Sequence, residues 1–187
     1  RLTHSLALTH KTDSPHFILV SSDQFLRQGF RFAPYPLSNG WVTSTLDNAL
    51  DLLPKAPGVQ LLVDIYYTDA PAIETLDRLR RISFEYPQNF IHLIAPTQDK
   101  KALRFMKAVT ALRIISRHSP FRTLRKKLLM PQPIQFNRKS HFSRDEWLIL
   151  MALTQGRSLK SIASDHDKDY HRIIYRLGRI VERLKLQ

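Results

Sequence analysis

The last forty-six residues, Phe142 to Gln187, carry the signals of three short helices in close succession. Ser143 followed three residues later by Glu146 has the spacing of a capping box, which predicts that a helix begins here. Gly156 is expected to end that helix, because glycine readily adopts the left-handed backbone of a helix C-terminus. A second short helix is expected from Ser158 onwards. The segment therefore predicts a compact all-α helix-turn-helix.

The third helix of this segment has two chemically different flanks. Apolar residues recur at helical spacing on one flank, at Ile173, Leu177, Ile180, Val181 and Leu184. Arginines recur on the other flank, at Arg172, Arg176, Arg179 and Arg183. We expect the first flank to pack into a core and the second to remain cationic.

These residues resemble the helix-turn-helix of LuxR-type regulators, also called the FixJ or NarL type. The matching positions, which need no insertion, are Phe142-Ser143, Glu146, Ile149-Leu150, Gly156-Arg157-Ser158, Lys160-Ser161-Ile162-Ala163, Ile173, Ile180 and Leu184. The chain departs from the family at His166, Lys168-Asp169, Arg172, Ile174 and Arg176. The scaffold is therefore similar, but the DNA-facing residues are not inherited. In the family a fourth helix, used for dimerisation, normally follows the position of Gln187.

The resemblance implies that the third helix reads double-stranded DNA. In a helix-turn-helix the second helix of the motif contacts bases, while neighbouring segments hold the backbone. The candidates for the major groove are Arg172, Tyr175, Arg176 and Arg179, and those for phosphates are Lys160, Lys168 and Arg183. The competing hypothesis is a protein-binding modulator that captures another response regulator and does not read DNA. The acidic turn at Asp165, Asp167 and Asp169 favours this alternative.

The composition is strongly basic and free of cysteine. The chain of 187 residues has a formal charge of +13, which attracts nucleic acid, an anionic membrane surface or an acidic partner protein. Residues 121–187 hold 15 Lys and Arg against 6 Asp and Glu, so we expect most of the excess to lie with the helix-turn-helix. No apolar run approaches the roughly 18 residues of a membrane span, which predicts a soluble, cytoplasmic protein.

No enzyme motif is present in the chain. The histidines are scattered, no glycine-rich phosphate loop occurs, and no nucleophile elbow is found. We therefore expect neither an enzyme activity nor a cofactor or metal.

The first 120 residues alternate short β-type runs with amphipathic stretches. Strands are expected at 17–20, 59–65, 90–95 and 112–115, and helices around 25–30, 45–53, 71–86, 99–109 and 120–129. This alternation is typical of βαβ units. It predicts a doubly wound α/β domain with a five-stranded parallel sheet and its functional edge at the strand C-termini.

This half resembles a response-regulator receiver, a flavodoxin-like domain, most clearly from Phe17 to Phe30. The phosphate-accepting aspartate of the family corresponds to Asp64. Its metal-holding acid pair corresponds to Ser21-Ser22, its switch hydroxyl to Ala95, and its lysine to Ser116 or Arg117. A lone carboxylate is a poor Mg²⁺ site, because phosphoryl transfer needs a metal to neutralise converging charges. The resemblance therefore implies a vestigial phosphorylation site, in which Asp64 is hydrogen-bonded or ion-paired with Arg117 as a candidate partner.

The domain boundaries follow from these assignments. Residues 1–15 are expected to form a loosely ordered leader, 16–129 a pseudo-receiver, 130–141 a proline-containing linker and 142–187 the helix-turn-helix. The pseudo-receiver would serve dimerisation or partner docking, in a homodimer or in a heterodimer with another response regulator. The combination is similar to the enteric auxiliary regulators associated with the Rcs system, such as GadE, on the residues 20–30 and Val63-Asp64 followed by Tyr66.

Overall fold

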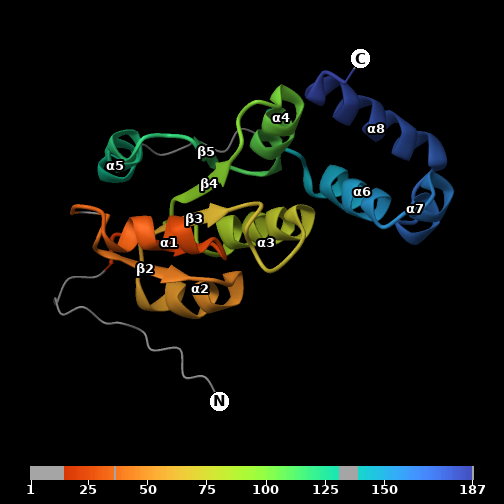
Figure 1. Ribbon diagram of the computed structural model, residues 1–187. Helices are drawn as coiled ribbons and strands as arrows, with labels where there is room; N and C mark the ends of the chain where they lie inside the picture. Colours follow the sequence, from red (N-terminus) through yellow and green to blue (C-terminus); the bar gives the residue numbers. More distant parts are fainter. Residues whose placement is uncertain (1–14, 36, 131–138, 187) are drawn as a thin grey trace.

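The computed structural model describes residues 15–35, 37–130 and 139–186. It contains an α/β domain followed by three helices at one end of the molecule (Figure 1). Most of the expected leader and most of the expected linker lie outside the described residues. None of the described helices is long and apolar enough to cross a membrane.

A five-stranded parallel sheet forms the centre of the α/β domain, as the sequence predicts. Its strand order is β2-β1-β3-β4-β5. The strands are β1 (Phe17–Val20), β2 (Gly40–Thr43), β3 (Gln60–Asp64), β4 (Ile91–Ala95) and β5 (Arg113–Ser116). The helices are α1 (Gln24–Arg31), α2 (Leu46–Leu52) with the short 3-10 turn η1 (Leu53–Lys55), α3 (Ala72–Glu85), α4 (Lys100–Val109) and α5 (Phe121–Leu129).

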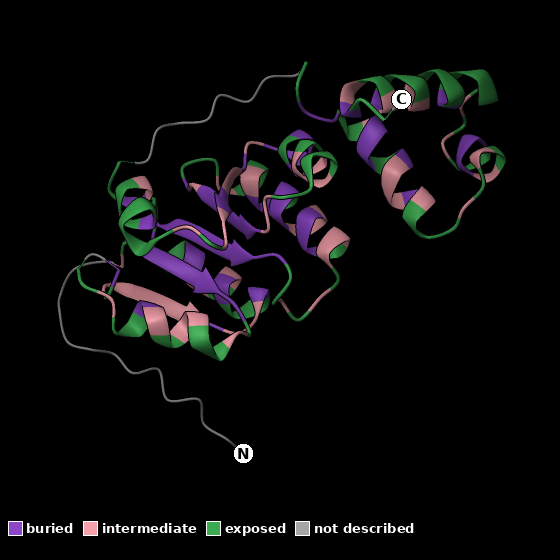
Figure 2. Ribbon diagram, turned by 45° about the horizontal axis from the view of Figure 1, so that its top comes forward, coloured by how far each residue is buried: buried purple, intermediate pink, exposed green. Residues whose placement is uncertain are grey.

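Helices cover both faces of the sheet, which is why its central strands are buried (Figure 2). Phe17 and Leu19 of β1 belong to the core under α1 and α5. The alternate residues Ile18 and Val20 belong to the core under α2, α3 and α4. The period of two along a strand therefore divides the apolar residues between two layers.

The strand β2 was not located from the sequence. It pairs with β1 at the edge of the sheet, with Gly40 opposite Phe17. A Cβ atom at Gly40 would lie 2.2 Å from Phe17 Cζ, so the phenyl ring requires glycine at this position. Three of the four residues of β2 are only half-buried, which weakens the apolar signal of a strand.

The C-terminal helices are α6 (Arg144–Thr154), α7 (Leu159–Asp165) and α8 (Tyr170–Leu184). The predicted capping box is confirmed, since the Glu146 amide donates to Ser143 Oγ over 3.2 Å and the Ser143 amide donates to Glu146 Oε2 over 2.7 Å. Gly156 follows α6 with a φ of +76°, as expected for a helix C-terminus. Ile149, Ile162 and Ile173 form the core between the three helices.

The helix-turn-helix packs directly against α3 and α4. The Phe142 amide donates to the Ala108 carbonyl over 2.7 Å, and the Phe142 ring stacks on Trp147 with a centroid distance of 6.1 Å. Phe105 of α4 lies against both rings. Ile180 of α8 belongs to the same apolar cluster. The two parts therefore share a hydrophobic contact.

Candidate nucleic-acid interface and receiver-like site

The receiver-like site lies at the carboxyl edge of the sheet, where the ends of β1 and β3 meet. Ser21 follows β1, and its hydroxyl donates to Asp64 Oδ2 over 3.0 Å. The neighbouring Ser22 is exposed, and its amide donates to the Tyr67 carbonyl over 2.6 Å. Ala95 ends β4 with a fully buried methyl group. The fold thus brings Ser21 and Asp64 into contact, while Ser22 points its side chain to solvent.

Arg117, directly after β5, reaches into this edge. Its guanidinium forms ion pairs with both Asp64 and Asp23, and it also lies 4.0 Å from the ring centroid of Tyr67. Asp23 additionally caps α1 by accepting from the Phe25 amide over 2.8 Å. Of the two candidates for the family's lysine position, Arg117 is the residue that contacts the aspartate.

The charges at this edge do not fit a divalent cation. Burial raises the pKa of the Asp64 carboxyl, while the neighbouring Arg117 guanidinium acts in the opposite direction. The guanidinium already neutralises Asp64 and Asp23, leaving Asp64 Oδ1 as the buried oxygen without a hydrogen-bond partner among the described residues. A single such oxygen beside a fixed positive charge is an unsuitable Mg²⁺ ligand set.

The outer surface of α8 presents part of the predicted DNA-binding set to solvent. Arg172 and Arg179 are exposed, and Tyr175 is 67% exposed between them. Together with Ser143 and Glu146 they line a shallow groove of about 450 Å³ between α8 and the start of α6. These side chains are therefore available to a ligand along the helix.

Three other predicted contacts already have carboxylate partners. Lys168 Nζ and Arg176 Nη2 both contact Asp145 Oδ2, over 2.7 and 3.0 Å. The hydrogen bond from Lys168 is the main cause of a lowered Asp145 pKa, and Arg176 adds to it. Arg183 is only 16% exposed and contacts Glu146 Oε2 over 2.7 Å. A phosphate contact by any of these three residues would require its ion pair to open. Lys160 on α7, by contrast, is exposed to solvent.

Sequence reasoning did not identify Ile174 as a surface residue. It is 42% exposed and precedes Tyr175 on α8. The available signal was the departure from the lysine that the LuxR-type pattern has at this position. An apolar side chain therefore lies on the exposed face of the helix.

The expectation that most of the positive charge lies with the helix-turn-helix was wrong. Residues 142–187 hold 9 Lys and Arg against 6 Asp and Glu, a net +3 of the total +13. The segment from Lys100 to Arg144 instead contains 13 Lys and Arg and no acidic residue. The cations of α5 belong to the α/β domain and account for part of the excess found in residues 121–187.

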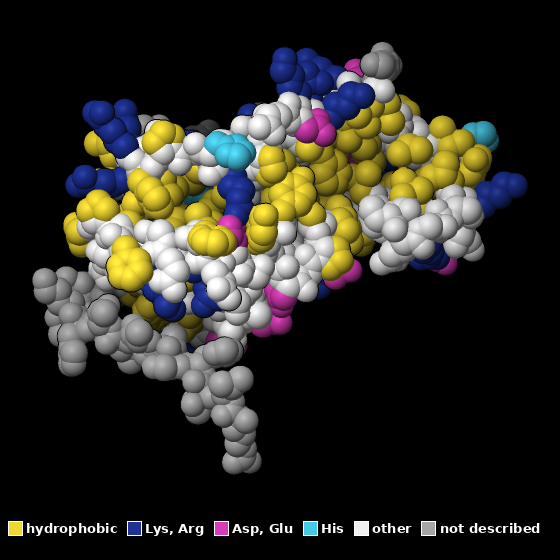
Figure 3. Space-filling view, in the orientation of Figure 1, with side chains coloured by type: hydrophobic (Ala, Val, Ile, Leu, Met, Phe, Trp, Pro, Cys, Tyr) yellow, Lys and Arg dark blue, Asp and Glu magenta, His cyan; other side chains and the backbone are white. Residues whose placement is uncertain are grey.

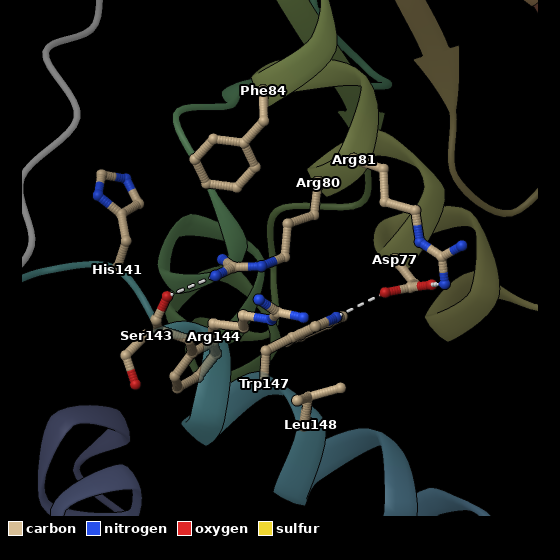
Figure 4. Close-up of a pocket in the computed structure, with 10 residues that line it drawn as sticks. Asp77, Arg80, Arg81, Phe84, His141, Ser143, Arg144, Trp147 and Leu148 are labelled. Carbon is tan, nitrogen blue, oxygen red and sulfur yellow. Dashed lines mark hydrogen bonds and ion pairs between the residues drawn. The ribbon is translucent and has the colours of Figure 1, made fainter.

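A second cavity lies between the two parts of the molecule. It has a volume of about 710 Å³ and is lined by residues of α3 and of the start of α6 (Figure 4). Trp147 Nε1 donates to Asp77 Oδ1 over 2.7 Å, and the buried Arg80 donates from Nη2 to the Phe142 carbonyl over 2.8 Å. These polar contacts link α3 to α6 across the boundary.

Comparison with known proteins shows a relative in sequence. No family model matches the chain. The Fimbriae Y protein of Salmonella typhimurium is 28% identical over 170 residues, an alignment that covers 90% of this chain and 69% of that protein.

Several solved structures have the same fold. RcsB of Salmonella enterica serovar Typhimurium, bound to the promoter rprA in the presence of the phosphomimetic BeF3−, is 15% identical with a TM-score of 0.50, and 92% of each chain is covered. A complex of the response regulator RcsB with DNA is 16% identical with a TM-score of 0.50, covering 92% of this chain and 93% of that one. The likeness therefore extends over the α/β domain and the helix-turn-helix together.

Proposed function

We propose that this protein is a sequence-specific, double-stranded-DNA-binding transcription regulator. The observation that carries the proposal is the cationic surface of α8, where Arg172, Tyr175 and Arg179 are exposed on a helix-turn-helix scaffold. Arginine and tyrosine on such a helix can reach base edges and phosphates in a major groove. The fold of the chain, like that of RcsB in its DNA complexes, supports this assignment.

The candidate contacts then fall into two groups. Arg172, Tyr175 and Arg179 contact DNA directly, with Lys160 holding a phosphate from α7. Lys168, Arg176 and Arg183 contribute only as DNA displaces their carboxylate partners Asp145 and Glu146. This exchange costs the energy of each ion pair and makes those three the weaker contributors.

The receiver-like domain, residues 16–129, acts in this proposal through dimerisation or partner docking and not through phosphorylation. This part of the proposal is supported by the ion pair between Asp64 and Arg117. The guanidinium lies against the carboxylate, where phosphoryl transfer would need a metal ion. Residues 130–141 connect it to the DNA-binding domain, residues 142–187. The choice between a homodimer and a heterodimer with another response regulator, the likeness to GadE and the cytoplasmic location stay predictions.

The alternative function is capture of another regulator without DNA reading. The exposed Ile174 and the acidic partners that occupy Lys168 and Arg176 favour it. It predicts that DNA affinity is absent or independent of α8.

A binding experiment separates the two functions. DNA fragments selected from genomic DNA by the full chain are titrated with the parent and with Arg172→Ala and Arg179→Ala variants at 50–200 mM salt. A base-reading arginine should cost about 1–3 kcal/mol and relax specificity at one position, whereas Lys160→Ala should weaken all sequences alike. Arg144→Ala, an exposed arginine on α6 that lines the cavity against α3, is the matched control. Unchanged affinity and specificity in both arginine variants, and in the variant that combines them, would support the alternative.

A further inference from the structure

The whole net charge of the chain comes from one continuous segment. Between Lys100 and Arg144 there are 13 Lys and Arg and no Asp or Glu, and outside this segment 16 Lys and Arg are balanced by 16 Asp and Glu. The segment includes α4, β5 and α5. The polyanion-attracting surface therefore lies mainly on the α/β domain.

Helix α4 has a solvent face made only of cations. Its exposed residues are Lys100, Lys101, Arg104 and Lys107, and every other residue of the helix is buried or half-buried. Lys100, Arg104 and Lys107 follow the four- and three-residue spacing that aligns side chains along one side of a helix. None of the four forms an ion pair with a carboxylate of the described residues. We call these four residues the α4 cationic face.

This face lies beside the C-terminal end of α8. Figures 1 and 3 show α4 next to the last turns of α8, with Lys and Arg side chains gathered over both. Ile180 and Leu184 of α8 share the apolar cluster that contains Met106 of α4. The α4 cationic face therefore continues the surface of α8 towards the α/β domain.

The dimensions of α8 bring a bound duplex close to this face. A helix of 15 residues is about 22 Å long, whereas the major groove is about 12 Å wide. If the N-terminal turns of α8 lie in the groove, its C-terminal turns lie at the groove edge, where the phosphates are. The α4 cationic face then lies beside the backbone that flanks the groove.

We propose that the α4 cationic face binds the DNA backbone next to the α8 site and supplies a large part of the salt-dependent affinity. The proposal rests on the proposed function and adds a binding surface on the domain that does not read bases. Each cation that neutralises a phosphate releases condensed counterions, and this entropy gain drives non-specific binding.

The composition of the face favours DNA over an acidic protein partner. Protein interfaces are depleted in lysine and enriched in aromatic residues at their centre. The α4 cationic face has three lysines and no exposed apolar side chain. By contrast, α5 and the residue after it combine their cations with the exposed Phe121, Leu129 and Met130, which suits a protein surface better.

The same helix α5 provides a charge-matched control. Its Arg122, Arg125 and Lys126 are also exposed, but α5 lies on the far side of the α/β domain from α8 (Figures 1 and 2). The test variant carries Lys100→Gln, Arg104→Gln and Lys107→Gln. The control carries Arg122→Gln, Arg125→Gln and Lys126→Gln, so both lose three positive charges.

Binding of the three proteins, each with all 187 residues, to a random-sequence duplex is measured by fluorescence anisotropy from 50 to 200 mM KCl. The parent should show a steep fall of affinity with salt. The α4 variant should lose about one unit of the log–log slope for each lost phosphate contact, and about tenfold or more in affinity at low salt. The α5 variant should stay close to the parent. Circular dichroism and thermal melting of all three proteins report whether each is folded.

Three outcomes would overturn the inference. Equal losses in the two variants would mean that only net charge matters, and no loss in the α4 variant would mean that the face does not contact DNA. Binding of a polyglutamate peptide that depends on α4, without an effect on DNA, would assign the face to an acidic partner. Failure of the proposed function looks different: α4-dependent binding of random duplex with no preference for any genomic fragment would uphold this inference and reject sequence-specific regulation.

Discussion

Trp147 donates its indole N–H to the carboxylate of Asp77 over 2.7 Å and so joins the first helix of the helix-turn-helix to α3 of the α/β domain. The Trp147 ring is almost fully buried against Phe142 and Phe105. Polar and apolar contacts thus coincide at the same boundary. We infer that the two parts unfold together. A substitution in α3 or α4 that removes one of these contacts should also alter the packing at the start of α6.

Replacing Trp147 by Phe should lower the free energy of unfolding by about 2–3 kcal/mol, because the hydrogen bond to the Asp77 carboxylate is lost and the smaller ring leaves part of the buried space unfilled. Urea unfolding followed by circular dichroism measures the change. Arg81→Ala removes the other partner of Asp77, but Arg81 is 76% exposed, so this control should change stability by less than about 0.5 kcal/mol. Equal stability of Trp147→Phe and the parent would show that the hydrogen bond contributes nothing.

Small phosphodonors should not modify the protein. By the resemblance to receivers, Ser21 and Ser22 correspond to the metal-holding acids, and the Asp64 carboxylate forms an ion pair with Arg117 and a hydrogen bond with Ser21. Incubation with acetyl phosphate and Mg²⁺ followed by intact-mass measurement should show unmodified protein. A stable phosphoryl adduct that disappears in Asp64→Asn would contradict the pseudo-receiver interpretation.

The pair Arg117 and Asp64 should behave as a coupled unit. Arg117→Met leaves a buried carboxylate without its cation, which should cost about 3–5 kcal/mol of stability. Adding Asp64→Asn should recover part of this loss, because the uncompensated charge is removed. Denaturant unfolding of the two single variants and the double variant gives the coupling energy, and strictly additive losses would argue against a direct interaction.

His92 should make stability depend on pH. Burial, with Arg113 and Lys127 adding to it, lowers the pKa of His92 to about 4, while a histidine in the unfolded chain has a pKa of about 6.5. The unfolded chain therefore binds the proton first, so stability is lost as the pH falls from about 6.5 towards 4, by about 3 kcal/mol at most. Urea unfolding at several pH values should show a shallower dependence for His92→Gln than for the parent. The same dependence in both proteins would assign the effect to other groups.

Local signals predicted much of the fold. The capping box of Ser143 and Glu146 and the stop at Gly156 act within one or two helical turns, so they can be read directly from spacing. The apolar periodicity that predicted Ile173 and Ile180 as core residues is confirmed by their burial. The alternation of strands and helices likewise predicted the parallel sheet, although β5 begins and ends one residue later than expected.

Signals that depend on a distant partner were missed. Gly40 has no strand propensity of its own, and its place in β2 follows from the Phe17 ring that it faces. The charge excess itself could be read from the sequence, since residues 100–144 hold 13 Lys and Arg and no Asp or Glu. Which cations share a surface depends on how α4 and α8 pack.

The sequence by itself determined the two kinds of domain and the helix ends at Ser143 and Gly156, because residue identity and short spacing suffice for each. Only the tertiary structure decided that Arg117 pairs with Asp64, a residue 53 positions away, and that Lys168, Arg176 and Arg183 have acidic partners on α6. The partners of a side chain decide whether it is available to a ligand. Those partners depend on distances between residues far apart in the sequence, and the packing of the helices and strands fixes these distances.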